Sequence, residues 1–397
     1  MTKTLTNRRA FLKSSLILGC SAAASPFITP VTFASAPWDT RLVVIVLRGA
    51  MDGLDVVQPY GDRAFAGHRK TLDFGEKGGA SDLDGFFSLH PNLKPLMPLW
   101  DKGELSFAHA VSTPYREKRS HFDGQDLLET GTNEVAGNRS TGRDGWLNRM
   151  ISLVPGATTE TALSVGRTNM LLLSGDAPHA NWSPDSDLDL SPQTYALLEA
   201  IYQDDPLFDQ AHKVARTFLD DNDMEGMKNV RKANAAKALA TLTAERLNAD
   251  SRVAAFSING WDTHINQKRS ISNALDELST AITTLRDGLG SNWQKTAVIC
   301  MTEFGRTVRE NGTKGTDHGT GGATILAGGA LRNAKVHGEW PGLGQGDLYQ
   351  DRDLMPTADV RRYAAWAMRD LFGLPAGDLE RVVFPGLDMG LDPKLMA

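Results

Sequence analysis

The sequence is poor in cysteine and has no excess of positive charge. Its 397 residues include only two cysteines, Cys20 and Cys300, and the formal net charge at pH 7 is −6. This acidic balance argues against a nucleic-acid or anionic-membrane partner. Cys300 lies in an apolar run that is typical of a small core residue, and no disulfide framework is expected.

Long apolar runs and several catalytic signatures are also missing. The apolar stretch near the start, residues 16–24, is shorter than the about 18 to 20 residues that a membrane-spanning helix needs, so we expect no transmembrane segment in the mature protein. No G-x-S-x-G elbow occurs, and the glycine-rich segment 315–322 has neither a P-loop lysine nor the G-x-G-x-x-G pattern. These absences argue against a Ser-His-Asp hydrolase and against nucleotide binding.

The first residues, 1–36, are predicted to be a targeting segment outside the fold. A twin-arginine pair lies within residues 7–13, an apolar stretch follows, and an Ala-Ser-Ala cleavage site occupies 34–36. We therefore expect the twin-arginine translocase to export the protein, which would be periplasmic or secreted. A second interpretation is lipid attachment at Cys20, although Leu18 fits a lipoprotein cleavage site poorly.

Loss of this segment would leave residues 37–397 as the mature protein. It removes four basic residues and no acids, so the formal net charge changes from −6 to −10. A chain of this length suffices for about two domains. No Pro-, Gly- or Ser-rich linker is long enough to separate them, and we predict a single domain with insertions.

Strands and helices alternate along this part, which predicts an α/β fold with a mostly parallel central sheet and helices on both faces. Apolar runs typical of buried strands occupy residues 42–47, 105–111, 162–165, 170–173, 253–258, 297–301 and 323–327. Helices are predicted at residues 191–203, 210–248, 265–289 and 357–372.

Four of the predicted strands are followed directly by acids, histidines or hydroxyls. The segments are 42–53, 105–126, 253–264 and 297–322. Parallel strands place their carboxyl ends at one edge of a sheet, where α/β proteins bind ligands. We therefore expect these side chains to converge on one site.

Two of these segments carry an aspartate close to a histidine. Asp262 and His264 are two residues apart in extended chain and would point to the same side, where they suit Zn²⁺ or Mn²⁺. Asp317 and His318 stand between glycines, where the backbone can approach a ligand closely. The plainer alternatives are a helix-capping Asp262 beside a surface histidine and a glycine-rich turn with incidental polar residues.

The other two segments supply further candidates. Asp52 and Glu303 end two strands and are candidate metal ligands, although Asp52 suits a turn and Glu303 suits an ion pair with Arg306. Ser120 is predicted to cap a short helix, a position that also favours an oxyanion and makes it a candidate nucleophile. His121, Arg306 and Asp317 are candidates for orienting substrate or moving a proton.

With these motifs, the sequence resembles the exported bacterial family described as domain of unknown function 1501, grouped with the alkaline phosphatase and sulfatase superfamily. The segments that carry the resemblance are 47–62, 120–132, 260–264, 302–307 and 315–322. The resemblance implies an alkaline phosphatase-like fold that holds one or two metal ions beside a serine or threonine nucleophile, here Ser120. The positions matching the superfamily's ligands are Asp52, Asp262, His264, Glu303, Asp317 and His318.

One departure from the superfamily concerns the metal. Glu303 and Phe304 stand where the superfamily has an aspartate and a histidine, so one imidazole is missing. A carboxylate in its place favours Mn²⁺, Ca²⁺ or Mg²⁺ over Zn²⁺, or a single ion.

These features predict an exported, metal-dependent hydrolase of phosphate or sulfate esters, in which Ser120 or water attacks a small-molecule or polymer substrate. The absence of a sulfatase Cys-x-Pro-x-Arg signature favours phosphate. The alternative is a non-catalytic binding or assembly protein on the same scaffold, which works with a co-exported protein partner.

Overall fold

The central sheet of the protein contains nine strands, in the order β11-β5-β10-β9-β1-β8-β6-β7 with β12 paired to β5. Their bounds are β1 Arg41–Arg48, β5 Leu105–Ser112, β6 Ala162–Val165, β7 Ala180–Trp182, β8 Val253–Asn259, β9 Thr296–Met301, β10 Gly322–Ala327, β11 Val336–His337 and β12 Ala358–Asp359. All neighbouring pairs are parallel except those of β10 with β5 and β9. The predicted α/β class with a mostly parallel sheet is confirmed.

This computed structural model describes residues 38–72, 74–116, 119–134, 144–166, 170–182 and 235–397. Residues 35–397 form one compact unit. The predicted targeting segment 1–36, the predicted helix 191–203 and most of the predicted helix 210–248 lie outside the described residues. Within the described ranges, no helix has the length and apolar character needed to cross a bilayer.

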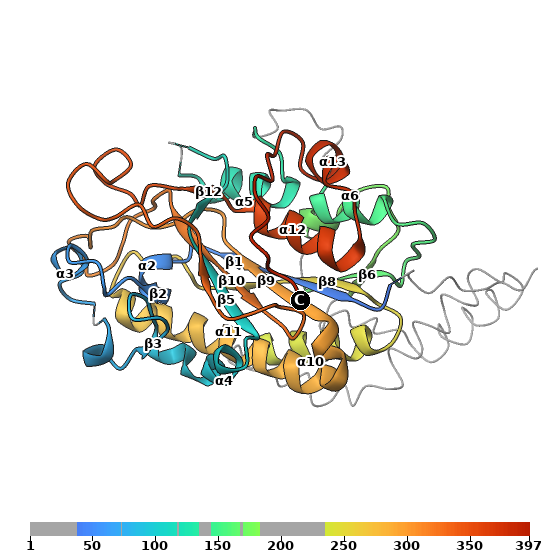
Figure 1. Ribbon diagram of the computed structural model, residues 1–397, viewed down its shortest axis with the longest axis horizontal. Helices are drawn as coiled ribbons and strands as arrows, with labels where there is room; N and C mark the ends of the chain where they lie inside the picture. Colours follow the sequence, from blue (N-terminus) through green and yellow to red (C-terminus); the bar gives the residue numbers. More distant parts are fainter. Residues whose placement is uncertain (1–37, 73, 117–118, 135–143, 167–169, 183–234) are drawn as a thin grey trace, which may run out of the picture. The chain divides into compact units, whose positions relative to one another are not determined.

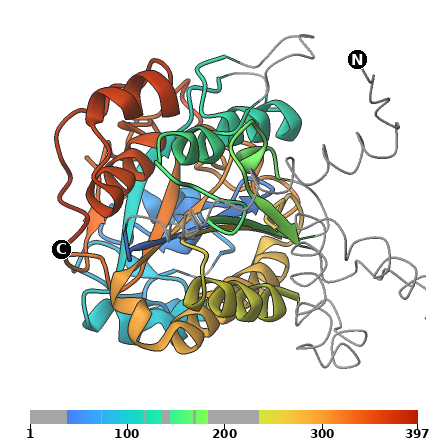
Figure 2. The same cartoon turned by 90° about the vertical axis from the view of Figure 1, so that its right-hand side faces the viewer.

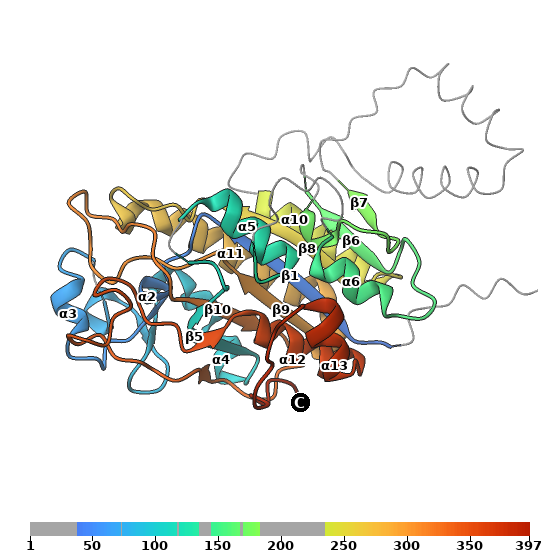
Figure 3. The same ribbon diagram turned by 90° about the horizontal axis from the view of Figure 1, so that it is seen from above.

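Helices cover both faces of the sheet, as Figures 1 and 2 show. One face carries α5 (His121–Thr130), α6 (Trp146–Ser152), α12 (Arg361–Phe372) and α13 (Ala376–Asp378), which lie toward the viewer in Figure 3. The other face carries α4 (Met97–Asp101), α10 (Ala235–Asn248) and α11 (Gln267–Leu289). Shorter elements are α2 Gly53–Val56, α3 Phe65–His68, the strands β2 Val57–Gln58, β3 Ser81–Asp82 and β4 Ser88–Leu89 of a small second sheet, 3-10 helices at Glu76–Gly78, Pro91–Leu96, Leu171–Leu173 and Gly290–Lys295, and a π-helix at Leu379–Val383.

The central strand β1 explains why two cores form. Its even-numbered residues from Leu42 to Val46 pack into one hydrophobic cluster, and its odd-numbered residues from Val43 to Leu47 pack into the other. Successive side chains of a strand point to opposite faces. An uninterrupted apolar run is therefore needed to supply both helix layers, as the sequence predicts.

One predicted strand is wrong, and one strand has a direction that the sequence does not predict. Residues 170–173 form the short 3-10 helix Leu171–Leu173 instead of a strand, because an apolar run of four residues does not distinguish the two and the Leu172 N–H donates to the Glu129 carboxylate. Strand β10 runs antiparallel to its neighbours. The chain between β9 and β10 contains no crossover helix, so it turns back at the edge where β9 ends.

Candidate metal centre

Four loops meet at the carboxyl edge of the parallel strands. The register aligns Arg48 of β1 with Asn259 of β8, and Val46 with Met301 of β9, so these strands end close together. Because β10 is antiparallel, the residues just before Gly322 also lie at this edge. The loops after β1, β5, β8 and β9 therefore share one region, as the sequence predicts.

Glycines allow these loops to touch through their backbones. A Cβ atom on Gly49 would lie 2.6 Å from the amide nitrogen of Asp262, and one on Gly315 would lie 2.2 Å from the carbonyl oxygen of His264. Real Cβ atoms do not approach so closely, so both positions require glycine. The segment 302–321 also folds back on itself, since the Gly319 N–H donates to the Gly305 carbonyl at 2.8 Å.

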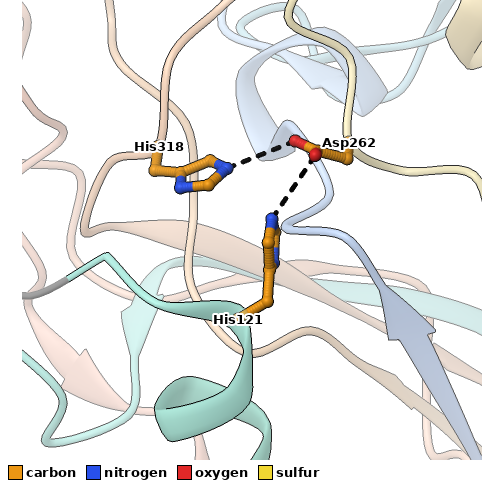
Figure 4. Close-up of side chains that lie close together, drawn as sticks. All are labelled: His121, Asp262 and His318. Atoms are coloured by element: carbon orange, nitrogen blue, oxygen red, sulfur yellow. Dashed lines mark hydrogen bonds and ion pairs between the residues drawn. The ribbon is translucent and has the colours of Figure 1, made fainter.

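Three imidazoles converge on the carboxylate of Asp262 at this edge. The Nε2 atoms of His264 and His318 lie 3.0 and 3.2 Å from Asp262 Oδ1. The Nε2 of His121 lies 3.5 Å from Oδ2, as Figure 4 shows together with His318. The two Nε2 atoms of His264 and His318 are 2.9 Å apart. Three imidazole nitrogens thus lie around the carboxylate of Asp262.

The other ring nitrogen of each imidazole is held by an acceptor. The Nδ1 contacts are His121 to Glu303 Oε1 at 2.8 Å, His318 to the Arg119 carbonyl oxygen at 3.0 Å, and His264 to Asp317 Oδ1 at 3.3 Å. An acceptor at Nδ1 favours the tautomer that leaves a lone pair on Nε2. Metal-binding histidines show this arrangement, with a carboxylate or carbonyl behind the ring.

The residues fit a divalent cation by an independent observation. The Nε2 of His121 is buried and forms no hydrogen bond with any described residue, since its contact with Asp262 Oδ2 is 3.5 Å long, and a buried nitrogen without a hydrogen bond is costly. One ligand atom each of His121, Asp262 and His318 lies within 4.8 Å of the other two. Imidazole nitrogens with a carboxylate are a donor set that suits Zn²⁺ or Mn²⁺.

The local electrostatics favour the cation-binding forms of His318 and Asp262, whereas the hydrogen bond with Glu303 raises the pKa of His121. Burial lowers the pKa of His318, and the nearby Arg306 guanidinium adds to this effect, which favours a neutral imidazole. Burial would raise the pKa of Asp262, but the hydrogen bond and positive charge of Arg306, together with contacts from His318 and His264, lower the pKa below its usual range. A neutral imidazole and an ionised carboxylate are the forms that bind a cation.

Arg306 is buried and holds the loops in place. Its guanidinium donates to Asp262 Oδ1 at 2.5 Å and to the backbone carbonyls of Gly49, Ala50, Trp261 and Thr316 at 2.7, 2.8, 3.1 and 2.8 Å. The alternative of an ion pair with Glu303 is therefore wrong, because the carboxylate that Arg306 pairs with is that of Asp262. Arg306 is the counter-ion of Asp262.

Glu303 and Asp317, both expected as ligands, lie behind the histidines. Glu303 is fully buried, and its Oε1 also accepts from the Gly49 N–H at 2.9 Å. Burial would raise the pKa of Glu303, but hydrogen bonds from His121, Gln125 and the Gly49 N–H lower it. Each of the two carboxylates thus orients an imidazole instead of pointing at the convergence point.

Replacing Glu303 by glutamine is expected to weaken metal binding by about 10- to 100-fold, because His121 loses the carboxylate that orients and polarises it. Titration of the metal-free protein with Zn²⁺ in a calorimeter measures this change. Glu245→Gln, on an exposed site of α10, is the matched control. An affinity equal to that of the unchanged protein would contradict the positioning role.

Asp52 is placed differently from the expectation. The chain turns at Gly49 and Ala50, both with positive φ, and Asp52 then caps α2. Both of its oxygens pair with the buried Arg69, at 2.6 and 3.0 Å, and Gln267 donates to Oδ2 at 2.6 Å. Asp52 therefore forms a buried ion pair with Arg69, and no sequence motif around Arg69 predicts this pair.

Ser120 caps α5, as predicted. Its hydroxyl accepts from the Asp123 N–H at 3.4 Å, and its own N–H donates to the Tyr115 hydroxyl at 2.8 Å. It stands between Arg119, whose carbonyl contacts His318, and His121. The sequence predicts His121 to orient substrate or move a proton, not to bind a metal, and the one local signal of its position in this cluster is that it follows a helix cap.

Fold and site together define an α/β protein with a histidine- and aspartate-lined metal-type centre at the carboxyl edge of its sheet. The chain belongs to the family described as Protein of unknown function (DUF1501), whose model matches residues 39–383. The family predicted from the motifs is confirmed. No curated protein sequence matches the chain.

Solved structures with a similar fold include members of the alkaline phosphatase superfamily. The lipoteichoic acid synthase LtaP from Listeria monocytogenes is 11% identical, with 92% of this chain and 78% of that chain covered and a TM-score of 0.44. The C-terminal periplasmic domain of EcEptC from Escherichia coli, in complex with Zn, is 12% identical, with coverages of 91% and 93% and a TM-score of 0.44. A protein of the alkaline phosphatase superfamily from Vibrio parahaemolyticus is 13% identical, with coverages of 82% and 71% and a TM-score of 0.38. Likenesses at this level carry no information about the reaction.

Proposed function

We propose that this protein is a metal-dependent hydrolase of phosphate or sulfate esters whose cation is held by His121, Asp262, His264 and His318. The convergence of three Nε2 atoms on one carboxylate, with every Nδ1 held by an acceptor, supports the proposal. His121 supplies the imidazole that the Phe304 position lacks. Three imidazoles shift the expected preference from Ca²⁺ and Mg²⁺ to Zn²⁺ or Mn²⁺.

The chain's own residues prepare this centre for an ester. A bound divalent cation would polarise the ester and stabilise the negative charge that develops as it is attacked. Arg306 keeps Asp262 ionised and fixed in place. The side chains of Asp262 and His264 are 49% and 38% exposed, so substrate can reach the centre from solvent.

Ser120 is the proposed nucleophile, with water as the alternative. It lies at the amino end of α5, where the helix dipole favours negative charge on a serine oxygen. The Ser120→Ala variant distinguishes the serine from water as the nucleophile, because this change abolishes turnover only if the Ser120 hydroxyl attacks the ester. The missing Cys-x-Pro-x-Arg signature supports phosphate over sulfate.

We propose that the reaction takes place outside the cytoplasm. The twin-arginine pair within residues 7–13 supports export by the twin-arginine translocase to the periplasm or beyond. We propose that residues 37–397 act there as a single domain on a small-molecule or polymer ester.

Hydrolysis assays on the protein without residues 1–36 test the function. We expect release of 4-nitrophenol from 4-nitrophenyl phosphate or sulfate, loss of this activity with a chelator, and recovery with Zn²⁺ or Mn²⁺. His318→Ala should be inactive after the same metal treatment, and His68→Ala, away from the centre, should be active. A metal-loaded protein that cleaves no ester in a broad panel would instead support the binding role with a co-exported partner.

A further inference from the structure

A polar cavity lies at the carboxyl end of β5, and none of the proposed metal ligands lines it. Its volume is about 560 Å³, and the polar residues that line it are Ser112, Thr113, Arg116, Asn133, Thr357, Asp359 and Arg361. It differs from the metal centre in having hydroxyls, an amide and guanidinium groups and no histidine. Its chemistry therefore suits an anion better than a cation.

The charges of the cavity do not cancel. Arg361 pairs with the carboxylate of Asp359 through two nitrogens, at 2.7 and 3.0 Å, and these two charges neutralise each other. Arg116 has no described carboxylate partner, since its Nη1 donates only to the carbonyls of Thr113 and Tyr115. One positive charge thus remains in a chain whose formal net charge is −6.

Donors are free to receive an oxyanion beside this charge. The Nε and Nη2 groups of Arg116 form no hydrogen bond with a described residue, and neither does the hydroxyl of Ser112, which is 6% exposed. A guanidinium presents its N–H groups in a planar fork that matches carboxylate, phosphate and sulfate. Arg116 is thus a partly buried cation with unused donors, and the nearby Asp359 carboxylate is already paired with Arg361.

The cavity and the metal centre share one connection of the chain. Arg116 lies on the loop from β5 to α5, which leads directly to Ser120 and His121. Thr113, in the wall of the cavity, donates from its hydroxyl to the Glu303 carbonyl at 3.2 Å. Glu303 also forms a hydrogen bond with His121. A ligand in the cavity would therefore be separated from His121 only by Thr113 and Glu303.

We infer that this cavity is a subsite for a second oxyanion of the substrate, with Arg116 as its main ligand and Ser112 as a further donor. The substrate class is then an ester that carries another phosphate, sulfate or carboxylate beside the group that is cleaved. That the anion belongs to the substrate rests on the proposed function, whereas the anion site itself does not.

Binding of pyrophosphate to the chelator-treated protein tests the anion site without any turnover. Calorimetry should show binding that is about tenfold or more weaker in Arg116→Gln, as expected for a lost charge-assisted hydrogen bond, and modestly weaker in Ser112→Ala. Arg332→Gln, an exposed arginine at the opposite edge of the sheet after β10, should bind as the unchanged protein does. His318→Ala should also bind normally. Equal affinity in Arg116→Gln and the unchanged protein would overturn the inference.

Kinetics with a matched pair of substrates test whether the anion belongs to the substrate. Glucose 1,6-bisphosphate should have a KM about tenfold below that of glucose 1-phosphate, and Arg116→Gln should remove this difference. Pyrophosphate binding without a KM difference would make the cavity a site for a free anion and overturn the subsite. If no ester is cleaved at all, the proposed function fails, and the pyrophosphate measurement alone decides whether the cavity binds anions.

Discussion

The Asp262→Asn protein is expected to lose its bound metal. Asp262 is the carboxylate on which the three Nε2 atoms converge, and asparagine removes its charge while it still offers an oxygen to Arg306. If about 10–16 kcal/mol of binding free energy is shared among four ligands, one ligand contributes about 3 kcal/mol, or roughly a hundredfold in affinity. Mass spectrometry of the purified protein, for metal content per chain, measures the loss.

Substitutions of the other proposed ligands, and of Asp52 as a control, test whether the metal loss is specific to this cluster. His264→Ala and His318→Ala should lose metal to a similar extent, because each removes one imidazole from the same point. Asp52→Asn should keep its metal, since that carboxylate is paired with Arg69. Full metal content in both Asp262→Asn and His318→Ala would show that this cluster is not the metal centre.

The second large effect is expected for Arg306. Arg306→Met removes the donor of four backbone carbonyls and the counter-ion of Asp262, and should lower the free energy of unfolding by about 3–5 kcal/mol. The free energy of unfolding of Arg306→Lys should lie between those of Arg306→Met and the unchanged protein, because an ammonium has three donors and no planar fork. Urea unfolding followed by circular dichroism measures the shift in midpoint.

A neighbouring arginine provides the control. Arg309 is exposed and donates only to the Asp351 carbonyl among described residues, so Arg309→Met should change the free energy of unfolding by no more than about 0.5 kcal/mol. An unfolding midpoint of Arg306→Met equal to that of Arg309→Met would mean that the guanidinium does not hold the loops together.

Local patterns were sufficient for most of the sheet. The apolar runs of β1, β5, β8 and β9 predict the strands to within a residue or two of their bounds, because each is a continuous segment buried on both faces. The direction of β10 was not predictable in this way. Strand direction depends on whether the connecting chain crosses the sheet, and periodicity within a strand carries no information on that.

Sequence by itself determined the fold class, the family and the edge of the sheet where polar side chains gather, because these follow from short-range patterns and motifs. Only the tertiary structure decided which acid faces which partner. Asp52 meets Arg69, Asp262 meets Arg306, and Glu303 meets His121, across 17, 44 and 182 residues of chain. Whether a carboxylate binds a cation, an arginine or an imidazole depends on which of these lies within a few ångströms of it, and that distance is set by how distant loops pack.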